Sequence, residues 1–259
     1  MGNYDAPKEV RELEKLIISL AYKSGADISQ IFDDFLRYII HGFSPGEKPL
    51  EDWKYKKEQT VVFYQMYAEW TQIVSRKVNV LGWYDAFGEL YMSCIAGNSR
   101  QANWGQFFTP SYICDLMTIL CGTQDESADI CSDPTCGSGR NLLAWHVKHL
   151  GSYLCAEDID RTCCMMTVCN LLIHGGVGEV IWHDSLDPES FYDGWKVNEV
   201  LTNSGLPTVR RITKEESVVW QSWQNRKDET KELIALPPKI VSMKDRREEA
   251  KKLQLNLFD

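Results

Sequence analysis

The sequence contains no long apolar run, although 44% of its 259 residues are hydrophobic. A helix that spans a bilayer needs about 20 consecutive, mostly apolar residues, and no stretch approaches this length. The N-terminus also lacks a basic region followed by a short apolar segment, which is the pattern of a secretory signal. We therefore expect a globular, cytoplasmic protein that makes no contact with a membrane.

Paired cysteines are missing as well. All nine cysteines lie between Cys94 and Cys169, and none has the CxxC spacing of a zinc site. We therefore expect no bound metal, and we interpret the cysteines as small apolar residues of the interior.

Positive charge is scarce. The chain has 28 Lys and Arg residues against 37 Asp and Glu residues, which gives a net charge of −9. Proteins that coat nucleic acid neutralise its phosphates with clustered Lys and Arg, so contact with DNA would depend on a local basic patch or on a partner. Two patches are candidates, although solvated surface charge is the simpler interpretation of each one alone: Lys54, Lys56 and Lys57 around Trp53 and Tyr55, and the pair Arg210 and Arg211.

Hydrophobic periodicity divides the chain into three parts. Apolar residues recur with the helical period up to about residue 99, which predicts an all-helical domain over 1–99. Residues 100–214 alternate β-rich runs with helical patterns, as in an α/β fold with a doubly wound parallel sheet. Strands are predicted at 128–132, 153–156, 180–182 and 197–201, and helices at 141–150 and 161–174. The polar residues 215–259 are predicted to form a helix or a mobile tail.

A glycine turn follows the first predicted strand. Residues 133–139 read DPTCGSG, and Gly137 and Gly139 would let the backbone approach a ligand closely. The next two predicted strands are followed by acidic residues, Asp158 and Asp184. In a nucleotide-binding sheet, carboxylates at such strand ends accept hydrogen bonds from ribose hydroxyls or from an adenine amino group. A glycine turn alone is weak evidence, but three such strand ends in order predict a nucleotide-like ligand.

These motifs resemble, in their order, those of the adenine-N6 DNA methyltransferases, and most of all the modification subunit of type I restriction systems. Four segments carry the resemblance: 105–110 (GQFFTP), 133–139 (DPTCGSG), 157–160 (EDID) together with 170–175 (NLLIHG), and 184–186 (DSL). The resemblance implies a Rossmann-like fold with S-adenosylmethionine (SAM) as the cofactor. The residues that it implies for cofactor binding are Phe108, Thr109, Pro110, Asp133, Pro134, Cys136, Gly137, Gly139, Asp158, Ile159, Asp184 and Ser185.

The catalytic motif of that family follows the fourth strand and reads Asn or Asp, Pro, Pro and an aromatic residue. The matching residues here are Asn203, Ser204, Gly205 and Leu206. The resemblance implies that Asn203 accepts hydrogen bonds from the adenine amino group, with Ser204 and Leu206 beside it. Both prolines and the ring that would stack on a flipped base are replaced, and the missing stacking is worth about 1–3 kcal/mol.

Three functions are compatible with these residues. The first is SAM-dependent methylation of adenine N6 in DNA, in a restriction-modification system with a specificity subunit as partner. The second is a catalytically degenerate SAM-binding or DNA-associated scaffold protein, which the altered residues 204–206 favour. The third is methylation of a substrate other than DNA, such as RNA or protein.

The end of the chain carries one further motif. Gln254, Leu255, Leu257 and Phe258 resemble the short peptide with which bacterial replication and repair proteins bind the sliding clamp. Because five residues are a small target, the end of an amphipathic helix is the simpler interpretation. The motif makes a sliding clamp a candidate partner of the tail.

Overall fold

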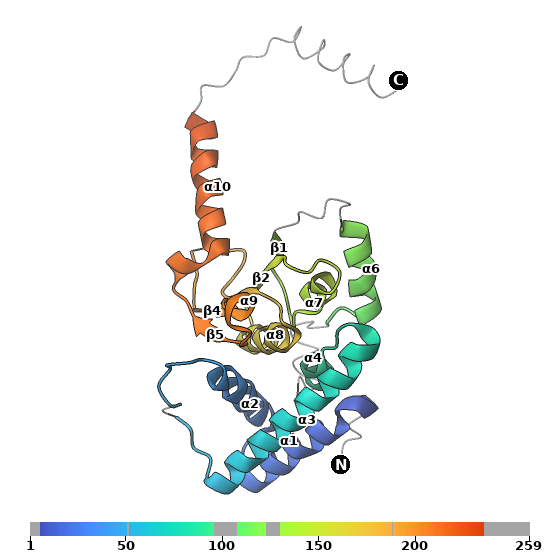
Figure 1. Cartoon of the computed structure of the whole chain (residues 1–259). Helices are drawn as coiled ribbons and strands as arrows, with labels where there is room; N and C mark the ends of the chain where they lie inside the picture. The colour runs from blue at the N-terminus through green and yellow to red at the C-terminus, as the bar shows by residue number, and fades with distance from the viewer. Residues whose placement is uncertain (1–5, 51, 96–107, 123–129, 188, 236–259) are drawn as a thin grey trace. The chain divides into compact units, whose positions relative to one another are not determined.

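The computed structural model describes residues 6–50, 52–95, 108–122, 130–187 and 189–235, and Figure 1 shows their helices and strands. The chain divides into two compact units, Met1–Trp220 and Gln221–Asp259. The first unit contains the N-terminal helices and a five-stranded sheet. Helix α10 (Val218–Ala235) begins in the first unit and supplies the described part of the second.

The N-terminal part is helical, as its periodicity predicts. Its elements are η1 (Lys8–Val10), α1 (Arg11–Ser24), α2 (Ile28–Gly42), α3 (Lys57–Leu81), α4 (Ala86–Leu90) and the π-helical turn η2 (Tyr91–Ile95). The apolar residues spaced by three or four positions are buried, and the rings of Phe32 and Phe35 both pack edge-on against Phe87. Burial of these apolar helix faces fixes the helices against one another.

The sheet has the strand order β1-β2-β3-β4-β5. Its strands are β1 (Ile130–Asp133), β2 (Tyr153–Asp158), β3 (Gly178–Trp182), β4 (Asp193–Val197) and β5 (Val209–Arg211). The first three strands are parallel and are joined by α7 (Arg140–His146) and α8 (Arg161–His174). Each of these connections leads to the next strand on the same side of the one before it. Because such connections are right-handed, both helices lie on the same face of the sheet, and α7 and α8 contact each other.

The second half of the sheet differs from the predicted parallel one, because β4 and β5 are antiparallel to their neighbours. A parallel crossover needs a dozen or more residues, and only residues 183–192 lie between β3 and β4. The predicted strand 197–201 is wrong: β4 ends at Val197, and residues Leu201–Ser204 form the short helix α9. Strand β5 was not predicted.

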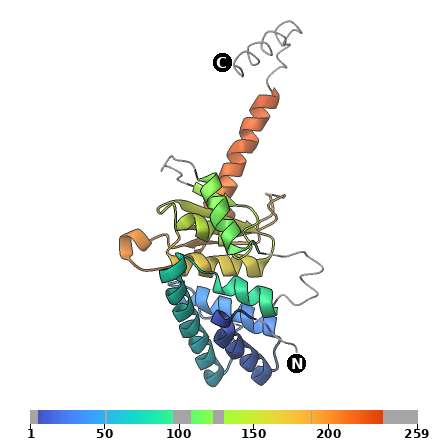
Figure 2. The same cartoon turned by 90° about the vertical axis from the view of Figure 1, so that its right-hand side faces the viewer.

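Helix α8 joins the two parts of the first unit. It lies between the sheet and α2, as Figure 2 shows, and most of its side chains are therefore buried. Asp160 caps its first turn by accepting hydrogen bonds from the amides of Thr162 and Cys163, and Gly175 ends it in the left-handed conformation. The predicted helix 161–174 is confirmed, whereas the predicted helix 141–150 ends earlier, at His146.

The remaining elements are α6 (Ser111–Cys121) and the 3-10 turn η3 (Lys214–Glu216). On the sheet face that carries Glu179, the buried carboxylate of this residue accepts hydrogen bonds from the Ser217 hydroxyl and from the amides of Val218 and Val219. This carboxylate thereby caps the first turn of α10. Within the described ranges, no helix combines the length and apolar character that a membrane crossing requires.

Candidate cofactor site

The turn after β1 is held by backbone hydrogen bonds and requires its glycines. The Cys136 amide donates to the Glu157 carbonyl of β2 and the Gly139 amide to the Cys136 carbonyl, both at 2.8 Å. Gly137 and Gly139 have φ values of +55° and +85°, where a side chain is strained. A Cβ atom on Gly137 would also lie 2.9 Å from the Phe108 ring. Larger residues would therefore distort this turn.

Asp133 and Cys136 serve the turn itself. One carboxylate oxygen of Asp133 accepts from the Thr135 amide and the other from the Asn141 side-chain amide, each at 3.1 Å. The Cys136 side chain is buried, and burial raises the pKa of its thiol well above the usual value. The thiol therefore stays protonated, while Pro134 beside it is exposed.

Asp158, at the end of β2, links two strand ends. Its Oδ2 accepts from the Gly137 amide and its Oδ1 from the Asp160 amide, both at 2.8 Å. Burial raises the pKa of Asp158, and these two backbone hydrogen bonds oppose the rise. An ionised carboxylate still has free acceptor positions after two such bonds. The apolar side chain of the next residue, Ile159, is 59% exposed.

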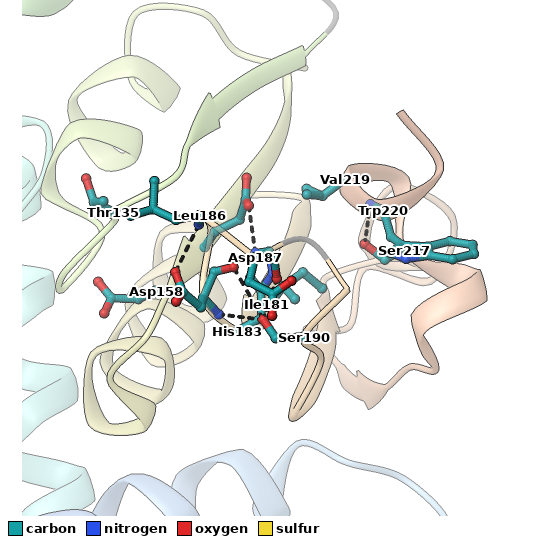
Figure 3. A network of polar contacts seen from close by, with 12 residues as sticks. Thr135, Asp158, Ile181, His183, Leu186, Asp187, Ser190, Ser217, Val219 and Trp220 are labelled. Atoms are coloured by element: carbon teal, nitrogen blue, oxygen red, sulfur yellow. Dashed lines mark hydrogen bonds and ion pairs between the residues drawn. The ribbon is translucent and has the colours of Figure 1, made fainter. Parts of the chain in front are cut away.

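The loop after β3 completes this edge of the sheet. The Asp184 amide donates to the Ser190 hydroxyl, and Oδ1 of Asp184 accepts from the Leu186 amide, each at 2.9 Å. Figure 3 shows hydrogen bonds of this loop, with the Asp158 side chain beside it. Because β1, β2 and β3 are parallel, the glycine turn, Asp158 and residues Asp184 and Ser185 all follow the carboxyl ends of strands. We call this side of the sheet the carboxyl edge.

The segment that contains Phe108, Thr109 and Pro110 lies beside the glycine turn. The Phe108 ring packs on Gly137 and stacks on the Tyr91 ring, with 5.5 Å between the ring centroids. The Thr109 carbonyl accepts from a guanidinium nitrogen of Arg140 at 3.3 Å, and Pro110 precedes the first residue of α6. The structure thus brings together two motifs that are separated in sequence; residues 105–107 of the first motif lie outside the described ranges.

A buried polar cluster that sequence reasoning missed holds these parts in place. The Asp85 carboxylate, 3% exposed, accepts from the Gly88 amide, the Asn170 side-chain amide, the Ser138 hydroxyl and Nε of Arg140, at 2.6–2.7 Å. It therefore connects α4, the glycine turn and α8. Two polar residues in otherwise apolar or small-residue surroundings, Asn170 and Arg140, are the sequence signals that could have revealed it.

Arg140 contributes further contacts to this cluster. One of its terminal nitrogens donates to Glu89 at 2.8 Å, and its guanidinium lies 5.7 Å from the centre of the Phe108 ring. Burial alone would lower the pKa of Arg140, but the Asp85 and Glu89 carboxylates raise it overall. The arginine is therefore charged and fixes the Phe108 segment to the turn.

The residues that the resemblance implies for catalysis lie elsewhere. Since β4 runs antiparallel to β3, its last residue, Val197, pairs with Gly178, the first residue of β3. The chain after β4 therefore begins at the opposite side of the sheet, which we call the amino edge. The length of β3 separates the two edges by about 13 Å along the strand direction.

Asn203, Ser204 and Leu206 belong to this amino-edge loop. Asn203 is an exposed residue of α9. The Ser204 hydroxyl donates to the Val200 carbonyl at 2.8 Å and accepts from the Leu206 amide, and the Leu206 side chain is 64% exposed. None of the three lies at the carboxyl edge with Gly137 and Asp158.

The buried residue of this loop is instead Asn198, which directly follows β4. Its Nδ2 donates to the carbonyls of Leu171, Leu172 and Gly176 at 3.0–3.3 Å, and its backbone has a φ of 57°. Asn198 therefore caps the last turn of α8 and fixes the start of the loop. An asparagine that follows a strand is compatible with many roles, so the sequence alone did not single it out.

The other sequence-based candidates find less support in the described residues. Both basic residues of the pair Arg210 and Arg211 face carboxylates, Arg210 those of Glu199 and Glu216 and Arg211 that of Asp193. The described part of the chain contains no cluster of three or more metal-ligating side chains. Gln254, Leu255, Leu257 and Phe258 lie outside the described residues.

The chain has an α/β fold in which three parallel strands carry a tight glycine turn and carboxylates at their carboxyl edge, the side of such a sheet at which ligands commonly bind. A family model described as N-6 DNA Methylase matches residues 83–233, which is more than half of the chain. The chain belongs to this family. The match begins two residues before Asp85 and includes the glycine turn, Asp158 and the amino-edge loop. No curated protein and no solved structure matched the chain.

Proposed function

We propose that the chain binds SAM at the carboxyl edge and acts in DNA methylation. The observation that carries this proposal is the hydrogen bond from the Gly137 amide to Asp158, which joins the glycine turn to the acidic end of the neighbouring strand. In this arrangement Asp158 accepts hydrogen bonds from the ribose hydroxyls, and the glycine turn allows close approach of the backbone. Bound SAM supplies an electrophilic methyl group on a sulfonium ion.

The chemistry of the carboxyl edge suits SAM better than a phosphate-bearing nucleotide. Asp133 and Asp158 end strands on this side of the sheet, and Asp160 and Asp184 follow within two residues of a strand end. Their carboxylates would repel phosphates, whereas SAM carries no phosphate and presents a sulfonium, an ammonium and ribose hydroxyls. The exposed apolar side chains of Ile159 and Leu186, the latter 93% exposed, offer contact surface for an adenine ring.

The acceptor in this proposal is adenine N6 in DNA, as the family implies. Bound SAM would supply the methyl group to this amino nitrogen with S-adenosylhomocysteine as the leaving group, and because the nitrogen would lose its proton afterwards, the chain would need no strong general base. Asn203 lies at the amino edge and does not orient that amino group. Groups at the carboxyl edge, or a partner such as a specificity subunit of a restriction-modification system, have to do so.

A second function is favoured by the position of Asn203. A chain that binds the cofactor but has its asparagine loop at the amino edge would be a SAM-binding scaffold protein that transfers no methyl group. Both functions predict cofactor binding, and they differ in whether a product is formed. The distinction therefore rests on an assay of transfer.

The experiment is methyl transfer from labelled SAM to unmethylated genomic DNA, followed by digestion to nucleosides. Labelled N6-methyladenine that disappears with Asp158→Ala supports adenine methylation. Saturable SAM binding without labelled DNA supports the scaffold function, and label in added RNA or protein would assign another substrate. Absence of SAM binding at millimolar concentration would overturn the cofactor assignment and with it both functions.

A further inference from the structure

A cavity of about 510 Å³ lies in the helical part of the molecule, where the end of α2, the following segment and the start of α3 meet. Its walls include five aromatic side chains, those of Tyr38, Phe43, Trp53, Tyr64 and Tyr67. Its volume falls in the range of about 300–1,000 Å³ that is usual for small-ligand sites. The proposed cofactor site does not use any of these residues.

The aromatic walls are held in place by their neighbours. Tyr38 and Trp53 are stacked, with 5.8 Å between ring centroids and 29° between ring planes. The Trp53 indole nitrogen donates to the Thr60 hydroxyl at 3.2 Å, which fixes the orientation of this ring. The Phe43 and Tyr67 rings lie 6.2 Å apart at 43°. The cavity is therefore preformed, with flat faces on more than one side.

Three tyrosine hydroxyls give this apolar cavity hydrogen-bonding capacity. Those of Tyr38, Tyr64 and Tyr67 form no hydrogen bond with another residue of the described ranges. Burial raises the pKa of Tyr38 and Tyr67, and the neighbouring tyrosines raise it further. The hydroxyls of Tyr38 and Tyr67 therefore keep their protons at neutral pH, and a tyrosine hydroxyl can both donate and accept a hydrogen bond.

A smaller hollow with positive charge adjoins the cavity. The two share His41 and Leu50 as lining residues, and the charged residues of the hollow are Arg37, Arg161, Arg211 and one carboxylate, that of Glu47. Arg37 and Arg211 face carboxylates. Arg161 has no acidic partner among the residues described, and its guanidinium lies 5.8 Å from the centre of the Trp182 ring. An anionic group beside the cavity would meet this free cation.

We propose that the aromatic cavity receives one unstacked nucleobase of a DNA strand, with a neighbouring phosphate directed to the hollow that contains Arg161. The proposal rests on the DNA-binding part of the proposed function. A base is planar, carries hydrogen-bonding groups on its edge and is linked to an anionic phosphate. A purely apolar ligand would use the rings but would leave the tyrosine hydroxyls and the arginine without partners. The proposal also gives Trp53, an aromatic residue beside the lysines at 54, 56 and 57, a defined role.

The test compares two labelled 12-nucleotide strands by fluorescence anisotropy at low salt, in the absence of SAM. One is oligo-dT, and the other has the same sugar-phosphate backbone without bases. The full-length protein should bind oligo-dT at least about tenfold more tightly than the abasic strand. Tyr64→Ala should weaken oligo-dT binding by about five- to hundredfold, as expected for the loss of one base–aromatic stack, and should leave abasic binding unchanged. Tyr64→Phe, which keeps the ring, should retain most of the affinity.

Tyr64 is 63% exposed, so its replacement should leave the fold intact, and Tyr22→Ala, at a 91% exposed tyrosine of α1, is the matched control. Arg161→Gln should weaken the binding of both strands, since it acts on the phosphate. Equal affinity for both strands, no binding of oligo-dT, or the same effect of Tyr64→Ala and Tyr22→Ala would overturn the proposal. SAM titration of the same samples shows whether the cofactor assignment fails independently.

Discussion

Both edges of the sheet lie within the residues of the family match, but only the carboxyl edge brings together residues from different strand ends that were expected to form one site. At the carboxyl edge, Gly137, Asp158 and Asp184 come from the ends of three different strands, and the first two are hydrogen-bonded to each other. At the amino edge, Ser204 bonds within its own loop and Asn203 is exposed. The difference arises from strand direction. Motifs that follow successive strands meet only while those strands remain parallel, and the chain reverses at β4.

The largest expected effect concerns the cluster that supports the carboxyl edge. Asp85→Ala leaves Arg140 buried without its main carboxylate, and loss of one partner of a buried pair costs about 3–5 kcal/mol. We expect the free energy of unfolding, measured by urea denaturation, to fall by about 3 kcal/mol because Arg140 keeps Glu89. Glu89→Gln is the control and should cost less than about 1 kcal/mol. Equal effects of the two changes would show that Asp85 is not the centre of the cluster.

Acid should destabilise the molecule through His174, at the amino-edge end of α8. This histidine is neutral when it donates from Nδ1 to the Asn170 carbonyl and accepts at Nε2 from the Tyr84 amide, and burial lowers its pKa to about 4. In the unfolded chain this histidine binds a proton near pH 6.5. Its contribution to the free energy of unfolding is therefore fully present above that pH and is lost as the pH decreases toward 4.

Over this interval, the difference between the pKa values of His174 in the unfolded and folded chain lowers the free energy of unfolding by roughly 3 kcal/mol. Urea denaturation at a series of pH values should show this slope, and His174→Gln should reduce it although His146, whose pKa is also lowered by burial, still contributes. Identical pH dependence in the wild type and the variant would contradict the assigned protonation state.

A smaller effect is expected from the residue that anchors the amino-edge loop. Asn198→Ala removes the hydrogen bonds to the end of α8. The alanine also has to adopt the left-handed φ of this position without the polar side chain that lets asparagine tolerate it. We expect a loss of about 1–3 kcal/mol in urea denaturation, with unchanged affinity for SAM. Asn198→Gly relieves the backbone strain and should lose less. A loss below about 0.5 kcal/mol for Asn198→Ala would show that the cap contributes little.

Sequence reasoning predicted those parts that depend on local pattern. Hydrophobic periodicity predicts the apolar faces of α1–α3 and the helix 161–174. The glycine turn follows from the backbone conformation that its glycines allow. Strand direction is not a local property, although the short connection from β3 to β4 already disfavours a parallel crossover. The Asp85 cluster was missed because Asp85, Ser138 and Asn170 lie 32 to 85 positions apart and become neighbours only on folding.

The contrast between the edges is tested most directly by calorimetric titration of SAM into the wild type, Asp158→Ala and Asn203→Ala. Asp158→Ala removes a charged hydrogen-bond acceptor and should weaken binding by about tenfold or more. Asn203→Ala changes an exposed residue of the amino edge and should leave the dissociation constant within about twofold. Equal weakening by the two substitutions, with both proteins folded, would contradict the assignment of the cofactor to the carboxyl edge alone.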